Sequence, residues 1–430
     1  TYLIFNSWFF SRVMLSKPKL NDPIIYVDNF IFKDSFDSKG AFFERYYSGY
    51  EKFLSRNENS RVWFCPTLID FKFPNHFFKI WKNYKLSNYN FLFEESWLSL
   101  RDSVTSLYLS LFTYRAVKKI PKYKSLNISP IVRNELLNEI ASPGLVKAMN
   151  KYFFISNLNK EGIKILKIIN WHENQNIDRA LNMGFHEFYP DVDSLGYQGY
   201  TFSSYEAHKN PLPFEVSKNT IPKKISVISE YARQEKLKYC KSLEVNIAPA
   251  LRFSYIHDAK LSNDSGEKIL LAALPIQLDQ CNQIINFLLS LDKKVIQSYK
   301  VLVKIHPSFV TGDFINKVPG ACDEMFSLCE EKISDIIDRV SFVLSSASSV
   351  CSEAVSLGIP VAIIANKYGI TQNPIPESFH NKLWRIVYDK EDLNKFLINS
   401  KKSISINPEQ LFHKPNKKEV REFFCAPGLI

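Results

Sequence analysis

Short apolar runs alternate along the chain with segments whose apolar residues recur at helical spacing. A buried parallel strand reads as a nearly continuous apolar run, whereas a helix repeats apolar residues every three or four positions. In the second half this pattern predicts strands at 269–274, 301–305, 340–344, 359–364 and 385–388. It also predicts helices at 281–291, 323–337, 350–357 and 390–398, the third of which would be capped by Gly358.

The first half repeats the alternation less regularly. Its strands are expected at 23–28, 60–65, 163–171, 194–200 and 224–229. Its helices are expected at 39–54, 91–119, 130–141, 145–154 and 177–183, the last ending at Gly184. A polar segment at 258–267 is the best linker, which divides the chain into domains at 1–258 and 267–400 and a tail or helix at 401–430. The fold class is therefore α/β, with two Rossmann-like doubly wound domains facing a cleft.

Composition limits which binding partners and which cellular compartment are expected. The net charge of +11 comes from scattered lysines, so no nucleic-acid groove is indicated, and an anionic nucleotide or an anionic membrane face suits this charge. The seven cysteines include no C-x-x-C pair, which favours reduced thiols in the cytoplasm over disulfides or a zinc site. No run of eighteen apolar residues occurs. The first residues lack an initiator methionine and a signal-peptide layout, which suggests a segment of a longer protein.

A serine-rich turn follows the predicted strand at 340–344. Its hydroxyls and the free N–H groups of the next helix would converge on an anion at the carboxyl end of a parallel strand. Glu353, one turn further on, could accept hydrogen bonds from a ribose. The alternatives are an ordinary crossover capped by serine and a solvated glutamate. The turn comprises Ser345, Ser346, Ala347, Ser348 and Ser349.

Two further polar clusters end predicted strands. His306, before Pro307, could donate a hydrogen bond to a phosphate, although a structural histidine fits equally well. Glu173 follows the strand at 163–171 and is flanked by Asn174 and Gln175. A carboxylate in that position is a candidate general base or nucleophile for an acceptor hydroxyl, and the alternative is a first-turn helix residue.

These features resemble a GT-B glycosyltransferase, in which a second Rossmann-like domain binds the donor nucleotide. A His-Pro strand end paired with a serine turn resembles the CMP-sugar-dependent Kdo transferases and sialyltransferases of bacteria. The resemblance implies nucleotide contacts from His306, Pro307, Ser345, Ser346, Ser348, Ser349 and Glu353. Three other strings resemble capsule and O-antigen biosynthesis proteins: W-H-E-N-Q at 171–175, G-Y-Q-G at 196–199 and A-L-R-F at 250–253. They imply substrate contacts from Asn174, Gln175, Tyr197, Gln198 and Arg252.

The sequence identifies the catalytic carboxylate less directly than the nucleotide contacts. The paired acidic motif of the sialyltransferases does not occur in the first domain, so Glu173 is the first candidate and Glu230 the second. Asp191 and Asp193 lie in a loop whose acidic residues favour turns. His306 and the serine turn could stabilise the departing phosphate without a metal, so no metal or other cofactor is expected. Arg252 or Arg233 could pair with a sugar carboxylate or form a surface ion pair.

The sequence thus leads to one expectation about function and to several alternatives. The expected protein is a cytoplasmic glycosyltransferase for surface polysaccharide that moves Kdo or another ulosonic acid from a CMP-activated donor. Its acceptor would be a glycan or a lipid-linked glycan, with peripheral association at the inner membrane and no nucleic acid partner. The alternatives are a UDP- or GDP-sugar transferase, a polyol-phosphate transferase, and a non-catalytic module that binds a sugar nucleotide or a polysaccharide. Inversion and retention both stay open.

Overall fold

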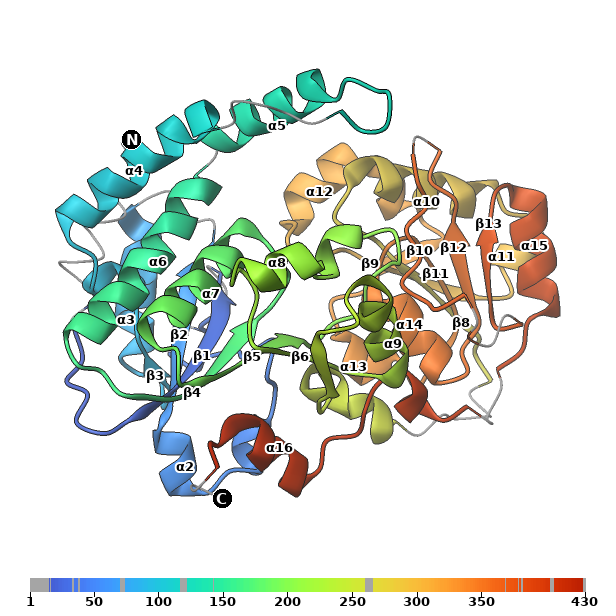
Figure 1. Ribbon diagram of the computed structural model, residues 1–430. Helices are drawn as coiled ribbons and strands as arrows, with labels where there is room; N and C mark the ends of the chain where they lie inside the picture. Colours follow the sequence, from blue (N-terminus) through green and yellow to red (C-terminus); the bar gives the residue numbers. More distant parts are fainter. Residues whose placement is uncertain are drawn as a thin grey trace.

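Two parallel β-sheets, each covered by helices, form the two halves of the molecule (Figure 1). The computed structural model describes residues 15, 17–32, 35–37, 39–69, 74–116, 122–141, 143–259, 266–367, 369–377, 379, 382–402 and 406–427. Most of the predicted linker lies outside these residues, as does the start of the chain. Among the described helices, none is long and apolar enough to cross a bilayer.

The first sheet has seven parallel strands in the order β3-β2-β1-β4-β5-β6-β7. From β1 the chain adds β2 and β3 on one side. It then returns to β4, beside β1, and adds β5, β6 and β7 on the other side. This is the doubly wound arrangement, with a switch point between β1 and β4. The strands are β1 (Ile24–Ile31), β2 (Val62–Leu68), β3 (Asn90–Phe91), β4 (Ile165–Trp171), β5 (Asp193–Gln198), β6 (Lys224–Val227) and β7 (Glu244–Ile247).

The second sheet has six parallel strands in the order β10-β9-β8-β11-β12-β13, with its switch point between β8 and β11. The strands are β8 (Ile269–Ala273), β9 (Lys300–Lys304), β10 (Phe326–Leu328), β11 (Val340–Ser345), β12 (Val361–Ile364) and β13 (Trp384–Val387). Every side chain of β8 and β12 is buried, as expected for strands covered on both faces.

Helices cover both sheets. In the first half they are α2 (Arg56–Ser60), α3 (Pro74–Tyr84), α4 (Leu100–Ala116), α5 (Ser129–Ala141), α6 (Gly144–Lys160), α7 (Asn176–Phe188), α8 (Pro213–Ser217) and α9 (Glu230–Tyr239). In the second half they are α10 (Leu278–Ser290), α11 (Lys293–Ile296), α12 (Thr311–Lys317), α13 (Ile333–Ile336), α14 (Ser349–Ser356) and α15 (Lys390–Asn399). Short 3-10 turns lie at Tyr50–Lys52, Glu94–Ser96, Ala207–Lys209, Leu251–His257, Pro319–Cys322 and Pro408–Gln410; the fourth is called η4 below.

The end of the chain returns to the first domain. Helix α16 (Lys417–Phe424) lies far from the second sheet in Figure 1. Phe424 stacks on Tyr50 with ring centroids 4.7 Å apart, and the Lys167 ammonium donates to the Glu422 carbonyl at 2.7 Å. The predicted tail therefore packs on the first domain. The chain crosses between the halves twice.

Two predicted helices are wrong, and each has a physical reason. Residues 39–49 form bends and turns instead of a helix, because the Glu44 carboxylate accepts from the backbone N–H groups of Tyr46 and Tyr47. Gly40 and Gly49 adopt positive φ there, at +84° and +73°. Instead of a helix at 323–337, the edge strand β10 pairs with β9 before the short α13.

Other boundaries shift by smaller amounts. The predicted helix at 91–119 begins only at Leu100, since Asn90–Phe91 pairs with β2. Helix α7 continues past Gly184 to Phe188. The Gly358 cap is confirmed by its φ of +73°.

Candidate functional site

Three polar clusters lie at the carboxyl ends of strands, as the sequence predicts. Glu173 follows β4, whereas His306 follows β9 and the serine turn follows β11. Burial lowers the pKa of His306, and the charges of Arg252 and Arg45 from the first domain lower it further. Arg45 and Arg252 of the first domain therefore lie near His306 of the second. We call the group Glu173, Arg45, Arg252, His306 and the serine turn the interdomain site.

A pocket of about 470 Å³ also opens between the domains. Phe202 and Tyr231 line it from the first domain, and Asn373 and Trp384 line it from the second. The Asn373 backbone N–H donates to the Ser203 hydroxyl at 3.2 Å, which joins the domains next to this pocket. A larger pocket, of about 920 Å³, lies within the first domain beside α4 and α6 and away from these strand ends.

Glu173 is half-buried and held in one orientation. The Trp171 indole donates to its Oε1 at 2.9 Å, and the Gln175 amide donates to its Oε2 at 2.8 Å. Its backbone N–H donates to the Asp178 carboxylate at 3.0 Å. Each carboxylate oxygen keeps a further lone pair, so Glu173 can still accept a proton from a bound hydroxyl.

Arg45 and Tyr46 complete the first domain's side of the site. The Tyr46 ring lies 4.3 Å from the Trp171 ring. Burial raises the pKa of Tyr46, the charges of Glu173 and Glu44 raise it further, and the charges of Arg252 and Arg45 oppose them. The phenol thus lies near Glu173 and near both arginines. Neither residue was predicted as part of a site, because the pattern at 39–54 was interpreted as a helix.

Arg252 is exposed on η4 and lies 5.6 Å above the Phe253 ring. Its charge acts on His306, Tyr46 and Tyr255, three groups contributed by both domains. The predicted Arg252 is therefore central to the interdomain site. Arg233, the other predicted arginine, bonds Glu230 at 3.0 Å on its own helix.

His306 has a defined tautomer in its neutral form. The Ser308 backbone N–H donates to Nδ1 at 3.2 Å, and the Ser308 hydroxyl lies 2.7 Å from the same nitrogen. Nδ1 is therefore the acceptor and Nε2 carries the proton. Because its pKa is lowered, His306 is neutral at pH 7 and offers one N–H donor. Pro307 is exposed beside it.

The hydroxyls of the serine turn mainly form hydrogen bonds to other groups of the protein. The buried Ser345 donates to the Ala273 carbonyl, Ser346 donates to Gln280 at 2.7 Å, and Ser348 caps α14. The prediction that these hydroxyls hold phosphate is thus corrected for Ser345 and Ser346, whose protons join β11 to neighbouring elements. The turn can still present the N-terminus of α14 to an anion.

Glu353 is neither solvated nor exposed to a ligand, since its side chain is 4% accessible. It accepts a hydrogen bond from Tyr255 of η4, and Ser349 also bonds it. Burial raises its pKa, although both hydrogen bonds oppose that rise. Glu353 therefore links the two domains, which corrects its expected role as a ribose ligand.

Four predicted substrate contacts are structural in this conformation. Asn174 is buried at φ +59° and donates to the His208 carbonyl at 2.8 Å and to Glu215. Tyr197 is buried and donates to the Pro249 carbonyl, and Gln198 is buried and donates to the Lys209 carbonyl. Gln175 is exposed but bonds Glu173.

Close packing accounts for the two glycines of the G-Y-Q-G string. A Cβ on Gly196 would lie 2.6 Å from Pro222 Cγ, and one on Gly199 would lie 2.3 Å from the Tyr197 ring. Neither position has room for a larger residue.

Glu230 lies apart from the other candidates. Its side chain is 53% exposed, and its carboxylate bonds Arg233 and Gln234 of its own helix. An exposed carboxylate paired within one helix is a poor general base. Among the described residues, no three His, Cys, Asp or Glu side chains are grouped as a metal site would require.

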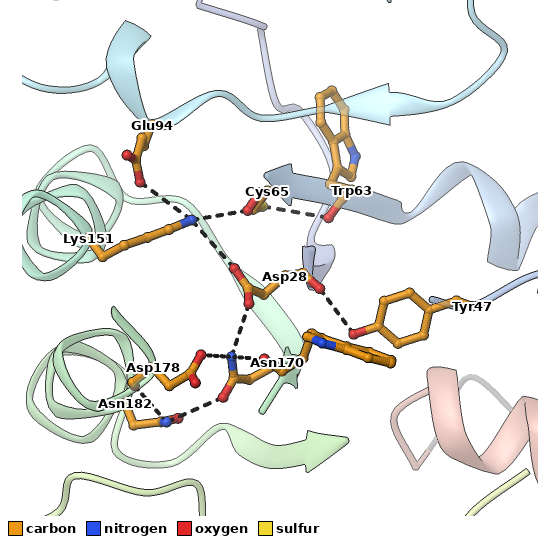
Figure 2. Close-up of polar contacts among 10 residues, drawn as sticks. Asp28, Tyr47, Trp63, Cys65, Glu94, Lys151, Asn170, Asp178 and Asn182 are labelled. Atoms are coloured by element: carbon orange, nitrogen blue, oxygen red, sulfur yellow. Dashed lines mark hydrogen bonds and ion pairs between the residues drawn. The ribbon is translucent and has the colours of Figure 1, made fainter. Parts of the chain in front are cut away.

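Lys151 lies in a buried network of charges that was not predicted from the sequence (Figure 2). The Lys151 ammonium lies 3.4 Å from both the Asp28 and the Glu94 carboxylates, and Asn170 donates to Asp28 at 3.0 Å. Burial raises the pKa of Asp28 to about 6 despite the lysine. The charges of Glu94 and Asp28 outweigh burial and raise the pKa of Lys151 to about 12.

Asp178 connects this network to the site. Its carboxylate accepts from the backbone N–H groups of Glu173 and Gln175 and from the Asn170 amide. Burial, followed by the charge of Asp28, raises its pKa to about 7. The network could have been suspected from Asp28 and Asn29, polar residues inside an otherwise apolar strand.

Comparison with known proteins supports an assignment of the fold. No family model and no curated protein sequence matches the chain. Among solved structures, UDP-GlcNAc 2-epimerase from Neisseria meningitidis, bound to UDP-GlcNAc, superposes with a TM-score of 0.52 at 12% identity. The match covers 93% of this chain and 99% of that one.

Two weaker matches are also complexes with UDP or a UDP-sugar's parts. Anabaena HepE in complex with UDP and glucose gives a TM-score of 0.42 at 8% identity and covers 93% of this chain and 96% of that one. S. aureus MnaA with UDP gives 0.41 at 16% identity, covering 80% and 85%. At such identities the similarity concerns architecture alone. The two doubly wound sheets and the full-length match to the epimerase establish that the chain has the GT-B fold.

Proposed function

We propose that the chain is a glycosyltransferase that uses a nucleotide-sugar donor at the interdomain site, with a CMP-activated ulosonic acid such as Kdo as the donor. The observation that carries the proposal is that Arg45 and Arg252 of the first domain lie close enough to His306 of the second for their charges to lower its pKa. Two guanidinium charges near one N–H donor suit a ligand with two anionic groups. A CMP-ulosonate carries a phosphodiester and a carboxylate.

His306 and the arginines would act on the leaving group. Nε2–H donates to the phosphate, while the N-terminus of α14 and the arginines stabilise the charge that develops as CMP departs. Groups held in place by the folded protein in this way would need little reorganisation when the bond breaks.

Glu173 would act on the acceptor. In an inverting reaction its carboxylate takes the proton of the attacking hydroxyl, and in a retaining one it attacks the anomeric carbon first. The hydrogen bonds from Trp171 and Gln175 hold the carboxylate in place in either case. Asp178 positions the backbone of Glu173 and takes no part in the chemistry.

A UDP-sugar donor is the second candidate. A diphosphate also presents two anionic groups to the arginines, and the superposed epimerase is bound to UDP-GlcNAc. A GDP-sugar, a polyol-phosphate donor and a non-catalytic binding module fit the same charges less specifically.

The test is calorimetric titration with CMP, UDP and GDP, followed by a turnover assay with the donor of the nucleotide that binds. We expect CMP to bind best and His306→Ala to weaken that binding at least about tenfold, since a hydrogen bond to a charged group is lost. Preference for UDP would select the second candidate. No binding of any nucleotide would refute the transferase, whereas binding without turnover of any donor would favour a binding module.

A further inference from the structure

Helix α4 buries three serines and exposes several of its large apolar residues, while Leu107 and Phe112 are half-buried. Ser103, Ser106 and Ser110 recur at helical spacing, and all three are buried. The Ser110 hydroxyl donates to the Ser106 carbonyl at 2.7 Å, within the helix. The side of α4 that meets the protein is therefore a serine face, opposite to the usual pattern of a surface helix.

The outward side carries a stripe of apolar residues, which we call the α4 stripe: Leu100, Val104, Tyr108 and Leu111. Their side chains are between 48% and 59% exposed. Spacings of four, four and three residues place them on one face of a helix. The core of the protein thus does not account for these residues, and exposed apolar side chains gathered on one helix face indicate an interaction site.

Further exposed apolar residues follow α4 along the chain. Tyr123 and Leu126 form a tight turn through paired backbone hydrogen bonds, and Ile131 follows on α5; all three are 60–66% exposed. Figure 1 shows α4 and α5 at the outer edge of the first domain, away from its sheet.

The sequence between α4 and α5 is basic. From Arg115 to Lys124 the sequence contains five Lys or Arg residues and no Asp or Glu. Lys122 and Lys124, which the structure describes, are both exposed. On α5, Glu135 is exposed, whereas Glu139 is bonded to Asn176 of α7.

We propose that the α4 stripe and the Lys122–Ile131 segment form a docking surface for an anionic lipid bilayer. Apolar and tyrosine side chains beside a basic cluster are the features of an element that lies in the membrane interface. Anionic lipids attract each basic residue near the surface. A second copy of the chain is a poorer occupant, because a two-fold contact would place the two basic clusters against each other. The proposal is independent of the nucleotide and would place the enzyme beside a lipid-linked acceptor.

The test is co-sedimentation of the whole chain with vesicles of phosphatidylcholine alone or mixed with phosphatidylglycerol. We expect binding to the mixed vesicles that weakens as salt is raised. Lys122→Glu with Lys124→Glu should reduce partitioning at least about tenfold. Lys293→Glu with Lys294→Glu, an exposed pair on α11, is the matched control and should bind like the wild type.

The stripe is tested separately by Val104→Ser with Leu111→Ser. Both side chains are exposed, so the variant should fold, which circular dichroism checks, and it should bind the mixed vesicles about tenfold less. Equal binding to both kinds of vesicle, or none, would overturn the proposal. A dimer in light scattering that the stripe variant dissociates, without vesicle binding, would assign the surface to a second copy instead.

Discussion

The two domains share one topology but have different interiors. The second domain buries apolar strands, and Glu353 is the one carboxylate or amine that is buried among its described residues. The first domain buries Lys151, Asp28 and Asp178 around the central strands β1 and β4, next to Glu173. Buried charges cost stability unless they are paired. The difference fits our proposal that the first domain positions a carboxylate, whereas the second offers a helix terminus to an anion.

The largest expected effect is on turnover, and it separates the role of the first domain from that of the second. Glu173→Gln should lower turnover roughly 10²- to 10⁴-fold, because a general base or nucleophile is lost, while nucleotide affinity stays unchanged. Turnover and calorimetric titration on one preparation check both. Glu230→Gln, an exposed carboxylate paired on its own helix, is the control and should retain full turnover. The reverse ranking would move the chemistry to Glu230.

The next effect is on stability. Lys151→Met leaves Asp28 and Glu94 without their cation and should lower the free energy of unfolding by about 3–5 kcal/mol. Denaturant unfolding measures it. Adding Asp28→Asn removes one of the unpaired charges, so the double variant should recover part of the loss. A Lys151→Met protein as stable as the wild type would show that the network does not stabilise the domain.

The buried carboxylates should also set a pH dependence. The pKa of Asp178 is raised from 3.8 to about 7, so its contribution to stability is complete below pH 4 and is lost as the pH rises to about 7. In that range one proton corresponds to about 1.4 kcal/mol per pH unit. Stability measured from pH 5 to 8 should therefore fall less steeply in Asp178→Asn than in the wild type. Identical slopes would contradict the raised pKa.

The smallest effect concerns the link between the domains. Tyr255→Phe removes a hydrogen bond to the buried Glu353 and should cost about 1–2 kcal/mol. Thermal unfolding measures this loss. Tyr388→Phe, at an exposed position, should be neutral. Equal stability of both variants would mean that the Tyr255–Glu353 contact contributes nothing.

The sequence also predicted the elements of the second domain better than those of the first. All five strands predicted in the second domain were found within two residues of their predicted ends, since continuous apolar runs mark them. The edge strand β10 was missed because Phe326–Leu328 is too short to show a pattern and is fixed by pairing with β9. In the first domain, residues 39–49 fold around the Glu44 carboxylate, which no periodicity reveals.

The site was predicted in part. The strand-end rule located Glu173, His306 and the serine turn, because parallel strands bring their carboxyl ends to one edge. It could not show that Ser345 and Glu353 bond inside the protein, since hydroxyl and carboxylate partners depend on tertiary packing. Arg45 was missed because its segment was assigned to a helix.

The central claim is that a nucleotide binds between the two domains, and a double-mutant cycle tests it most directly. Titration of wild type, Arg252→Ala, His306→Ala and the double variant with the preferred nucleotide gives four affinities. We predict that each single variant binds at least about tenfold more weakly and that the two effects are not additive, with a coupling of about 0.5–3 kcal/mol. If Arg252→Ala binds as tightly as the wild type, the nucleotide is held by the second domain alone and the account is wrong.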